Sequence, residues 1–171
     1  MLIDAADRKD GRQRHSDDVQ KVDLYLSLGS NQGDRRHNIE IALPLLNIEL
    51  KKPYKAVSSL IETEPWGFES DEKFINAAVH YELEFPKGYN AEAEALMILE
   101  ICKDIERRLG RTGGPRYGEK GERIYSSRPI DIDILLFGEN KIDCPELTIP
   151  HKLMHERDFV MIPLNEIKSD L

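Results

Sequence analysis

Several features that mark particular classes of protein are scarce or missing in this sequence of 171 residues. It has only two cysteines, Cys102 and Cys144, which is too few for the disulfide framework of a small secreted domain, so a reducing compartment such as the cytoplasm is expected. No run of 18 apolar residues occurs, and no transmembrane helix is predicted. Residues 1–20 contain no apolar segment of the kind that forms the core of a secretory signal.

A basic overall charge is also missing, because the formal net charge is −8. Proteins whose main ligand is a nucleic acid backbone usually have a basic surface, so this charge argues against such a partner. The arginines are nevertheless concentrated within 22 positions, at residues 107, 108, 111, 116, 123 and 128. A local basic pocket for a small anionic ligand is therefore expected.

The sequence contains alternating strand and helix patterns. Period-2 apolar alternation predicts strands over residues 22–28, 54–63, 74–85 and 130–137. Helical spacing predicts a helix through residues 39–46 that kinks at Pro44, a second over 90–109 and a short one over 151–158. The order βαββαβ favours an α+β domain with a mixed or antiparallel sheet.

Residues 111–127, RTGGPRYGEKGERIYSS, contain four glycines and several cations. Loops of this length are usually functional or disordered, and this one is expected to be flexible. The sequence has no GxxxxGK[ST] phosphate-binding loop. Any phosphate must therefore be held by side chains and metal.

Two carboxylates interrupt the apolar strand at residues 130–137. Asp131 and Asp133 are two residues apart, so they share one face of the strand with Cα atoms roughly 6.5–7 Å apart. Ile130, Ile132 and Ile134 point the other way into the core, whereas Leu135 and Phe137 are expected to continue the aspartate face.

Like charges held together repel each other, and removing each from water costs free energy. Magnesium relieves both effects and prefers carboxylate oxygens together with phosphate oxygens and water. Such a pair can hold two metal ions about 3.5–4 Å apart. The alternative is a solvated sheet face on which each aspartate pairs with an arginine. Arg128 and the cationic loop just upstream favour a phosphoryl-transfer site.

Four segments, in this order, resemble the 6-hydroxymethyl-7,8-dihydropterin pyrophosphokinase family of folate biosynthesis: LYLSLGSNQGDR, FINAAV, RPIDIDILLFG and LTIPHKLMHERDFVMIPLNEI. The resemblance runs from Asp23 to Ile167, and the spaced aspartates followed by Leu-Thr-Ile-Pro-His form its most specific part. It implies an α+β fold with a ferredoxin-like βαββαβ core and helices on both faces. The charged composition of residues 1–21 predicts a flexible extension, and the resemblance implies a single catalytic domain over residues 22–171.

The resemblance further implies transfer of the diphosphate of ATP to the hydroxymethyl group of the pterin, with AMP as the second product. Asp131 and Asp133 would hold two magnesium ions, and Arg111 and Arg128 would act with them in catalysis. The residues implied for ATP binding are Lys103, Glu106, Arg111, Tyr125, Arg128, Ile134, Leu147, Thr148, His151 and Arg157. Those implied for the pterin are Thr63, Trp66, Phe74, Asn76 and Phe159, with the ring between Phe74 and Phe159.

Some points stay open at this level. Either Arg116 or Arg123 corresponds to a second arginine of the family's catalytic loop, and Phe74 stands where tyrosine is common. His151 and His155 lie four residues apart, but a zinc site would need a third ligand. The partners expected are ATP and the pterin, with no nucleic acid or membrane, and the protein is expected to be a cytoplasmic monomer.

Two other functions are compatible with parts of the pattern. A two-metal nucleotidyl transferase or cyclase would also use paired aspartates, but it would release pyrophosphate rather than AMP. A non-catalytic βαββαβ module such as an RNA-recognition domain would share the element order. The acidic charge and the missing [KR]-G-[FY]-[GA]-F-V segment speak against it.

Overall fold

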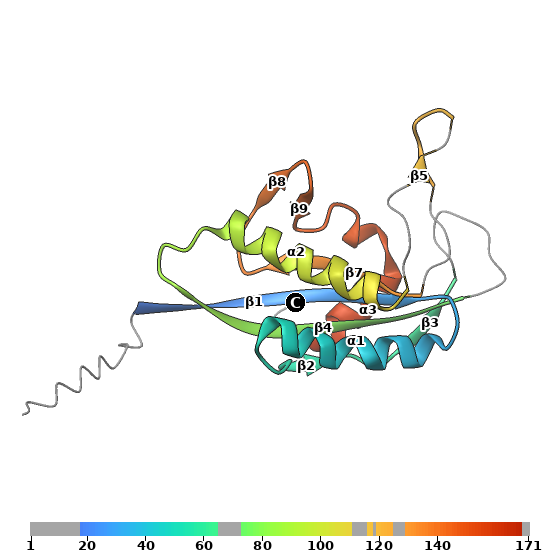
Figure 1. Ribbon diagram of the computed structural model, residues 1–171, viewed down its shortest axis with the longest axis horizontal. Helices are drawn as coiled ribbons and strands as arrows, with labels where there is room; N and C mark the ends of the chain where they lie inside the picture. Colours follow the sequence, from blue (N-terminus) through green and yellow to red (C-terminus); the bar gives the residue numbers. More distant parts are fainter. Residues whose placement is uncertain (1–17, 65–72, 111–115, 118, 125–128, 169–171) are drawn as a thin grey trace, which may run out of the picture.

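The computed structural model describes residues 18–64, 73–110, 116–117, 119–124 and 129–168. Its centre is an antiparallel sheet in the order β2-β4-β1-β7, with β3 also paired to β4 (Figure 1). The bounds are β1 (Val19–Ser30), β2 (Ala56–Val57), β3 (Ile61–Thr63), β4 (Phe74–Pro86) and β7 (Asp131–Phe137). β1 thus begins at Val19, three residues before the start expected from the sequence.

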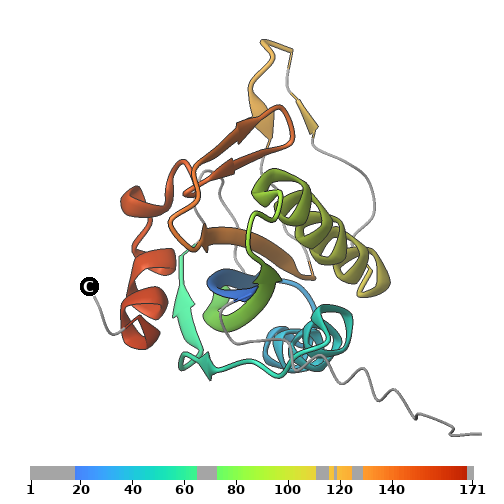
Figure 2. The same ribbon diagram turned by 90° about the vertical axis from the view of Figure 1, so that its left-hand side faces the viewer.

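Helices cover both faces of this sheet, as Figure 2 shows. α1 (Arg35–Leu50) and α2 (Ala91–Arg108) pack on one face over the larger apolar core. The 3₁₀ helix η2 (Met154–Glu156) and α3 (Asp158–Ile167) cover the other face over a smaller core. The α+β class with helices on both faces is therefore confirmed. Among the described residues, no helix has the length and apolar character needed to span a membrane.

Side-chain caps fix where the two long helices begin. Asp34 Oδ1 accepts a hydrogen bond from the His37 amide at 3.1 Å, and Asn90 Oδ1 accepts one from the Ala93 amide at 3.0 Å. Each cap satisfies a backbone N–H that the first helical turn leaves without a partner. Pro44 lies inside α1, which continues through it to Leu50, and the kink expected there stays a prediction.

Two predictions about the outer elements were wrong. Residues 54–63 do not form one strand, because β2 and β3 are separated by residues 58–60. Residues 151–158 are not a single short helix, since η2 ends at Glu156 and α3 begins at Asp158. Two hairpins were not predicted: β8 (Ile142–Cys144) with β9 (Leu147–Ile149), and β5 (Arg116–Tyr117) with β6 (Arg123–Ile124).

β7 contains a bulge that changes which residues share a face. Leu26 pairs with Ile134 and Tyr25 pairs with Leu136, so Leu135 has no partner residue in β1. The extra residue reverses the alternation beyond it. Leu135 is buried in the smaller core, on the aspartate face as predicted, whereas Phe137 is buried in the larger core beneath α1 and α2. The prediction that Phe137 continues the aspartate face was therefore wrong.

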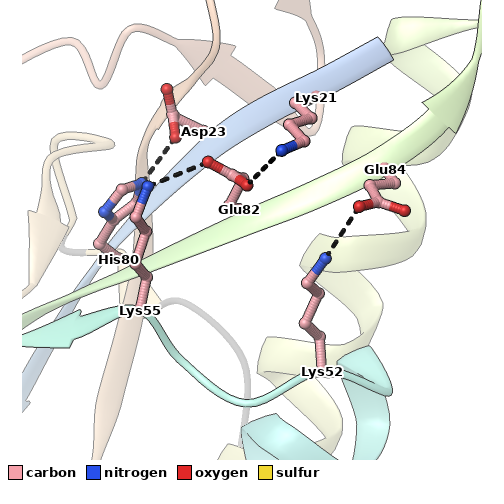
Figure 3. Close-up of polar contacts among 7 residues, drawn as sticks. All are labelled: Lys21, Asp23, Lys52, Lys55, His80, Glu82 and Glu84. Atoms are coloured by element: carbon pink, nitrogen blue, oxygen red, sulfur yellow. Dashed lines mark hydrogen bonds and ion pairs between the residues drawn. The ribbon is translucent and has the colours of Figure 1, made fainter. Parts of the chain in front are cut away.

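At one end of the sheet, β1 and β4 carry a group of charged side chains (Figure 3). Glu82 pairs with Lys55 at 3.0 Å and with Lys21 at 3.4 Å. His80 Nε2 lies 2.7 Å from Asp23 Oδ1. These five residues are called the ion-paired end below. Lys21, Asp23, His80 and Glu82 lie on the same face of β1 and β4 as the candidate site but toward the opposite end of the strands, and Lys55 reaches Glu82 from just before β2.

Candidate active site

The register of the sheet places the predicted residues in two rows on one face. Asn76 of β4 pairs with Gly29 of β1, and Gly29 pairs with Asp131 of β7. In the next row, Ser27 pairs both with Ala78 and with Asp133. Directly paired residues of antiparallel strands lie on the same face. The centre of this face therefore carries only small side chains, with Asn76 on one side and the aspartates on the other.

Gly29 makes room for the polar and aromatic groups beside it. A Cβ atom at this position would lie 2.9 Å from Asn76 Oδ1 and 3.5 Å from Phe74 Cδ1. The buried Asn76 in turn donates from Nδ2 to Thr63 Oγ1 at 2.5 Å. Gly29, Thr63, Phe74 and Asn76 thus meet at the junction of β1, β3 and β4, and three of these are predicted pterin-binding residues.

The two aspartates are half-buried and lie on the face opposite the large core. Ile132 and Ile134, which alternate with them, are both buried in that core. The backbone between the aspartates is held by α2, because Glu106 Oε1 accepts a hydrogen bond from the Ile132 amide at 2.9 Å. β7 is the last strand on its side of the described sheet, so Glu106 satisfies an N–H group at the sheet edge.

The carboxylates between α2 and β7 affect the pKa of a buried thiol. Burial raises the pKa of the Cys102 thiol above its ordinary value. The charges of Glu106, Asp133 and Asp131 raise that pKa further, in this order. Three carboxylates therefore act on one point at the interface of α2 and β7. Glu106 reaches this interface from the helix and contacts the strand backbone between the aspartates.

The aspartate pair fits a magnesium ion by its donor chemistry. In the described part of the chain, no three His, Cys, Asp or Glu side chains are grouped so that they could hold a metal ion. Two carboxylates alone do not make a closed structural metal centre. They do suit magnesium, which prefers oxygen ligands and commonly takes the remaining ones from water and substrate phosphates.

The bulge in β7 also positions His151. The carbonyl of Leu135, the bulged residue, accepts a hydrogen bond from the His151 amide at 3.0 Å. His151 Nδ1 accepts a hydrogen bond from the Leu153 amide at 3.3 Å. In the neutral ring the proton therefore resides on Nε2, which makes Nε2 a donor.

The start of α3 contributes a cation and an aromatic ring. Arg157 is buried, and its guanidinium carbon lies 5.7 Å from the centroid of the Phe159 ring. Phe159 is half-buried and packs on the smaller core. This placement brings Arg157 and Phe159 to the face of the sheet that carries the aspartates.

A model of the family described as 7,8-dihydro-6-hydroxymethylpterin-pyrophosphokinase matches residues 25–169. The chain belongs to this family. The match includes both rows of the site and the whole of α3. It confirms the function expected from the resemblance, diphosphate transfer to 6-hydroxymethyl-7,8-dihydropterin in folate biosynthesis.

Individual relatives give the same result. A 2-amino-4-hydroxy-6-hydroxymethyldihydropteridine pyrophosphokinase of Porphyromonas gingivalis is 43% identical over 145 residues, which cover 84% of this chain and 89% of that protein. The Bacillus subtilis protein of that description is 37% identical over 143 residues, covering 84% and 76%. A mitochondrial folate synthesis bifunctional protein of Pisum sativum is 37% identical over 152 residues, covering 87% of this chain and 26% of that protein.

The other residues expected in this pyrophosphokinase site are spread around it. Leu147 and Thr148 are half-buried in β9, which lies beside β7. Lys103 is exposed on α2. Ile134 is buried in the larger core, on the side of β7 that faces α1 and α2. Four predicted residues lie outside the described residues: Trp66, Arg111, Tyr125 and Arg128. Only the backbone of Arg116 and Arg123 is described, in β5 and β6.

Sequence reasoning missed one residue that joins the segments carrying the predicted pterin-binding residues. Arg35, the first residue of α1, donates to the Lys73 carbonyl at 2.6 Å and to Glu62 Oε2 at 3.0 Å. It thereby joins the residues next to Thr63 and Phe74. The only signal in the sequence was Arg35 directly after the helix cap, and a cap alone does not predict a contact with another strand.

Proposed function

We propose that this face binds ATP and the pterin side by side, and that the diphosphate passes between them over Gly29 and Ser27. Asp131 and Asp133 would hold two magnesium ions, whose charge would neutralise the phosphate oxygens during transfer. The observation that carries this proposal is the register. It places the amide-aromatic group and the carboxylate pair on one face, two strand spacings apart, which is about 10 Å.

The pterin side is supported by the groups that meet around Gly29. An amide has both donor and acceptor atoms, which suits the edge of a pterin, and Thr63 fixes the orientation of the Asn76 amide. Phe74 lies on the same face, and α3 brings Phe159 to it from the opposite layer. A flat heterocycle stacks favourably between two aromatic rings.

The ATP side is supported by cationic and polar groups near the aspartates. His151 is held against β7 through the Leu135 carbonyl, and Arg157 lies at the start of α3. Both would contact phosphate oxygens, together with Arg111 and Arg128. Leu147, Thr148, Lys103 and Glu106 would surround the nucleotide. Catalysis would then depend on positioning and on electrostatic stabilisation rather than on a strong base.

A product assay tests this function directly. The protein is incubated with ATP, magnesium and 6-hydroxymethyl-7,8-dihydropterin, and AMP and pyrophosphate are measured separately. We expect one AMP for each pterin consumed, no pyrophosphate, and loss of turnover when a chelator removes magnesium. Release of pyrophosphate would favour the nucleotidyl transferase alternative. AMP formation that persists in the chelator would contradict the assignment of Asp131 and Asp133 to metal.

We further propose that the enzyme works as a monomer in the cytoplasm. Cys102 and Cys144 are both free thiols in the structure, which supports a reducing compartment. Sedimentation analysis at the concentrations used for the assay would test the monomer, because a dimer would have twice the expected mass.

A further inference from the structure

The last turn of α3 is joined to the edge of the sheet by a two-point contact. Glu166 Oε1 accepts a hydrogen bond from the Ser59 amide at 2.8 Å, and Glu166 Oε2 accepts one from the Ser59 hydroxyl at 2.7 Å. The two residues are 107 positions apart in the sequence. Both carboxylate oxygens are engaged by one residue, and this contact is called the Ser59–Glu166 contact below.

Ser59 is available to α3 because the edge strand is interrupted at this point. Ser58 donates its amide to the Ala78 carbonyl at 2.9 Å, and its hydroxyl accepts from the Ala78 amide at 2.8 Å. The hydroxyl takes the role that a backbone carbonyl has in a regular ladder. The next residue, Ser59, therefore turns its amide away from β4 and toward α3.

This contact connects α3 to the row of small residues in the site. Ala78 pairs with Ser27, so the chain of hydrogen bonds runs from the site row through Ser58 and Ser59 to Glu166. Phe159 lies seven residues before Glu166 on α3, which is about two helical turns and places both on the same side of the helix.

We propose that Glu166 is a positioning residue for the pterin substrate. The Ser59–Glu166 contact sets the position of α3 against β3 and β4, and thereby the separation between Phe159 and Phe74. The inference rests on the proposed function, in which these two rings enclose the pterin. Glu166 itself does not touch the substrate.

The apolar contacts of α3 cannot set this separation alone. Val160 and Leu164 are buried in the smaller core and hold α3 on the sheet, but apolar packing has no directional preference along the helix axis. Two hydrogen bonds from one carboxylate to one residue fix both distance and orientation, and hydrogen bonds to a charged group are the stronger kind.

The test compares Glu166→Gln with Asn165→Ala, a control at the neighbouring exposed position of α3. In the glutamine variant one acceptor oxygen and the charge are lost. We expect KM and Kd for the pterin to rise about tenfold, with KM for ATP and kcat changed by about twofold or less. Asn165→Ala should leave all four values unchanged.

Ser59→Ala provides a second route, because it removes only the hydroxyl and keeps the amide donor. We expect a smaller rise in pterin KM, and the double variant should resemble Glu166→Gln because both changes remove the same contact. The proposal is overturned if the thermal midpoint falls while pterin KM and Kd stay unchanged, or if KM for ATP rises by the same factor.

Phe159→Ala separates failure of this inference from failure of the proposed function. If Phe159→Ala raises pterin KM and both variants at Ser59 and Glu166 leave it unchanged, only the positioning role is wrong. If Phe159→Ala also leaves pterin KM unchanged, the enclosure of the pterin by Phe74 and Phe159 is wrong.

Discussion

The two ends of the central sheet carry different groups of charged side chains on the same face. At the ion-paired end, acids meet bases that the chain itself supplies: Glu82 contacts Lys55 and Lys21, and Asp23 contacts His80 (Figure 3). At the site end, the register places Asp131 and Asp133 next to each other, beside the small residues Gly29 and Ser27.

Under the proposed function, the charges at the ion-paired end serve the fold, and the two aspartates serve a ligand. The two lysine–glutamate pairs at the ion-paired end are solvent-exposed, and such pairs contribute little to stability and can be lost without leaving a buried charge. Two adjacent carboxylates repel each other and cost stability, a cost that functional sites commonly bear. Removing a charge at the site end should therefore change the stability of the protein little and lower its activity strongly. Removing a charge at the ion-paired end should change both only slightly.

The largest effect is expected from neutralising one member of the aspartate pair. Asp133→Asn keeps the shape of the side chain but removes the charge proposed to hold magnesium. We expect kcat/KM to fall by a factor on the order of 10³, the size found when a group that stabilises transition-state charge is removed. The thermal midpoint should stay the same or rise, because the repulsion with Asp131 is relieved.

Asp143→Asn, an exposed aspartate in β8, is the matched control and should change neither activity nor midpoint. Isothermal titration of magnesium gives a second readout that is independent of turnover. The proposed difference between the two ends is contradicted if Asp133→Asn retains the activity of the wild type, or if its thermal midpoint falls by several degrees.

A smaller but more selective effect is expected from Gly29→Ala. The added Cβ would lie 2.9 Å from Asn76 Oδ1, so the Asn76 side chain must move. We expect KM for the pterin to rise about tenfold, which corresponds to about 1.4 kcal/mol, with KM for ATP unchanged. In an Asn76→Ala background the same substitution should have little further effect, because the atom it displaces is gone. Equal effects in both backgrounds would contradict this reading of the site.

The sequence was sufficient for the features that depend on one strand. Side chains alternate with period 2, so Asp131 and Asp133 were correctly placed on one face, opposite Ile132 and Ile134. This prediction held because it needs only the residues that are adjacent in the chain.

Features that depend on two distant segments could not be predicted. The bulge at Leu135 reversed the face of Phe137, and no residue type in the strand indicates a bulge there. The break between β2 and β3 depends on Ser58 bonding to Ala78, and the Ser59–Glu166 contact joins residues 107 positions apart. Pairing and docking of this kind are set by packing in three dimensions, not by local periodicity.

A pH series tests the Ser59–Glu166 contact through stability. The hydrogen bonds from the Ser59 side chain and amide lower the pKa of Glu166 below its ordinary value of 4.5. A carboxylate with a lowered pKa stabilises the fold above its unfolded pKa, and this contribution is lost as the pH falls through the folded pKa. We therefore expect the midpoint of the wild type to exceed that of Glu166→Gln at neutral pH, the difference to shrink as the pH falls below the ordinary value of 4.5, and the two midpoints to converge below the lowered pKa of Glu166. A constant difference over the whole series would contradict the contact.

The smallest effect is expected at the ion-paired end, from Glu82→Gln. The hydrogen bond from Lys55 is the main cause of the lowered pKa of Glu82, and Lys21 adds to it. Both lysines are well exposed, so salt and water screen these pairs. We expect unchanged kcat and KM values and a midpoint lower by no more than about 2 °C, a difference that disappears at high salt. If Glu82→Gln instead lowered kcat/KM as Asp133→Asn is expected to do, charge on this face would act on catalysis from either end. The distinction between charges that serve the fold and charges that serve a ligand would then fail.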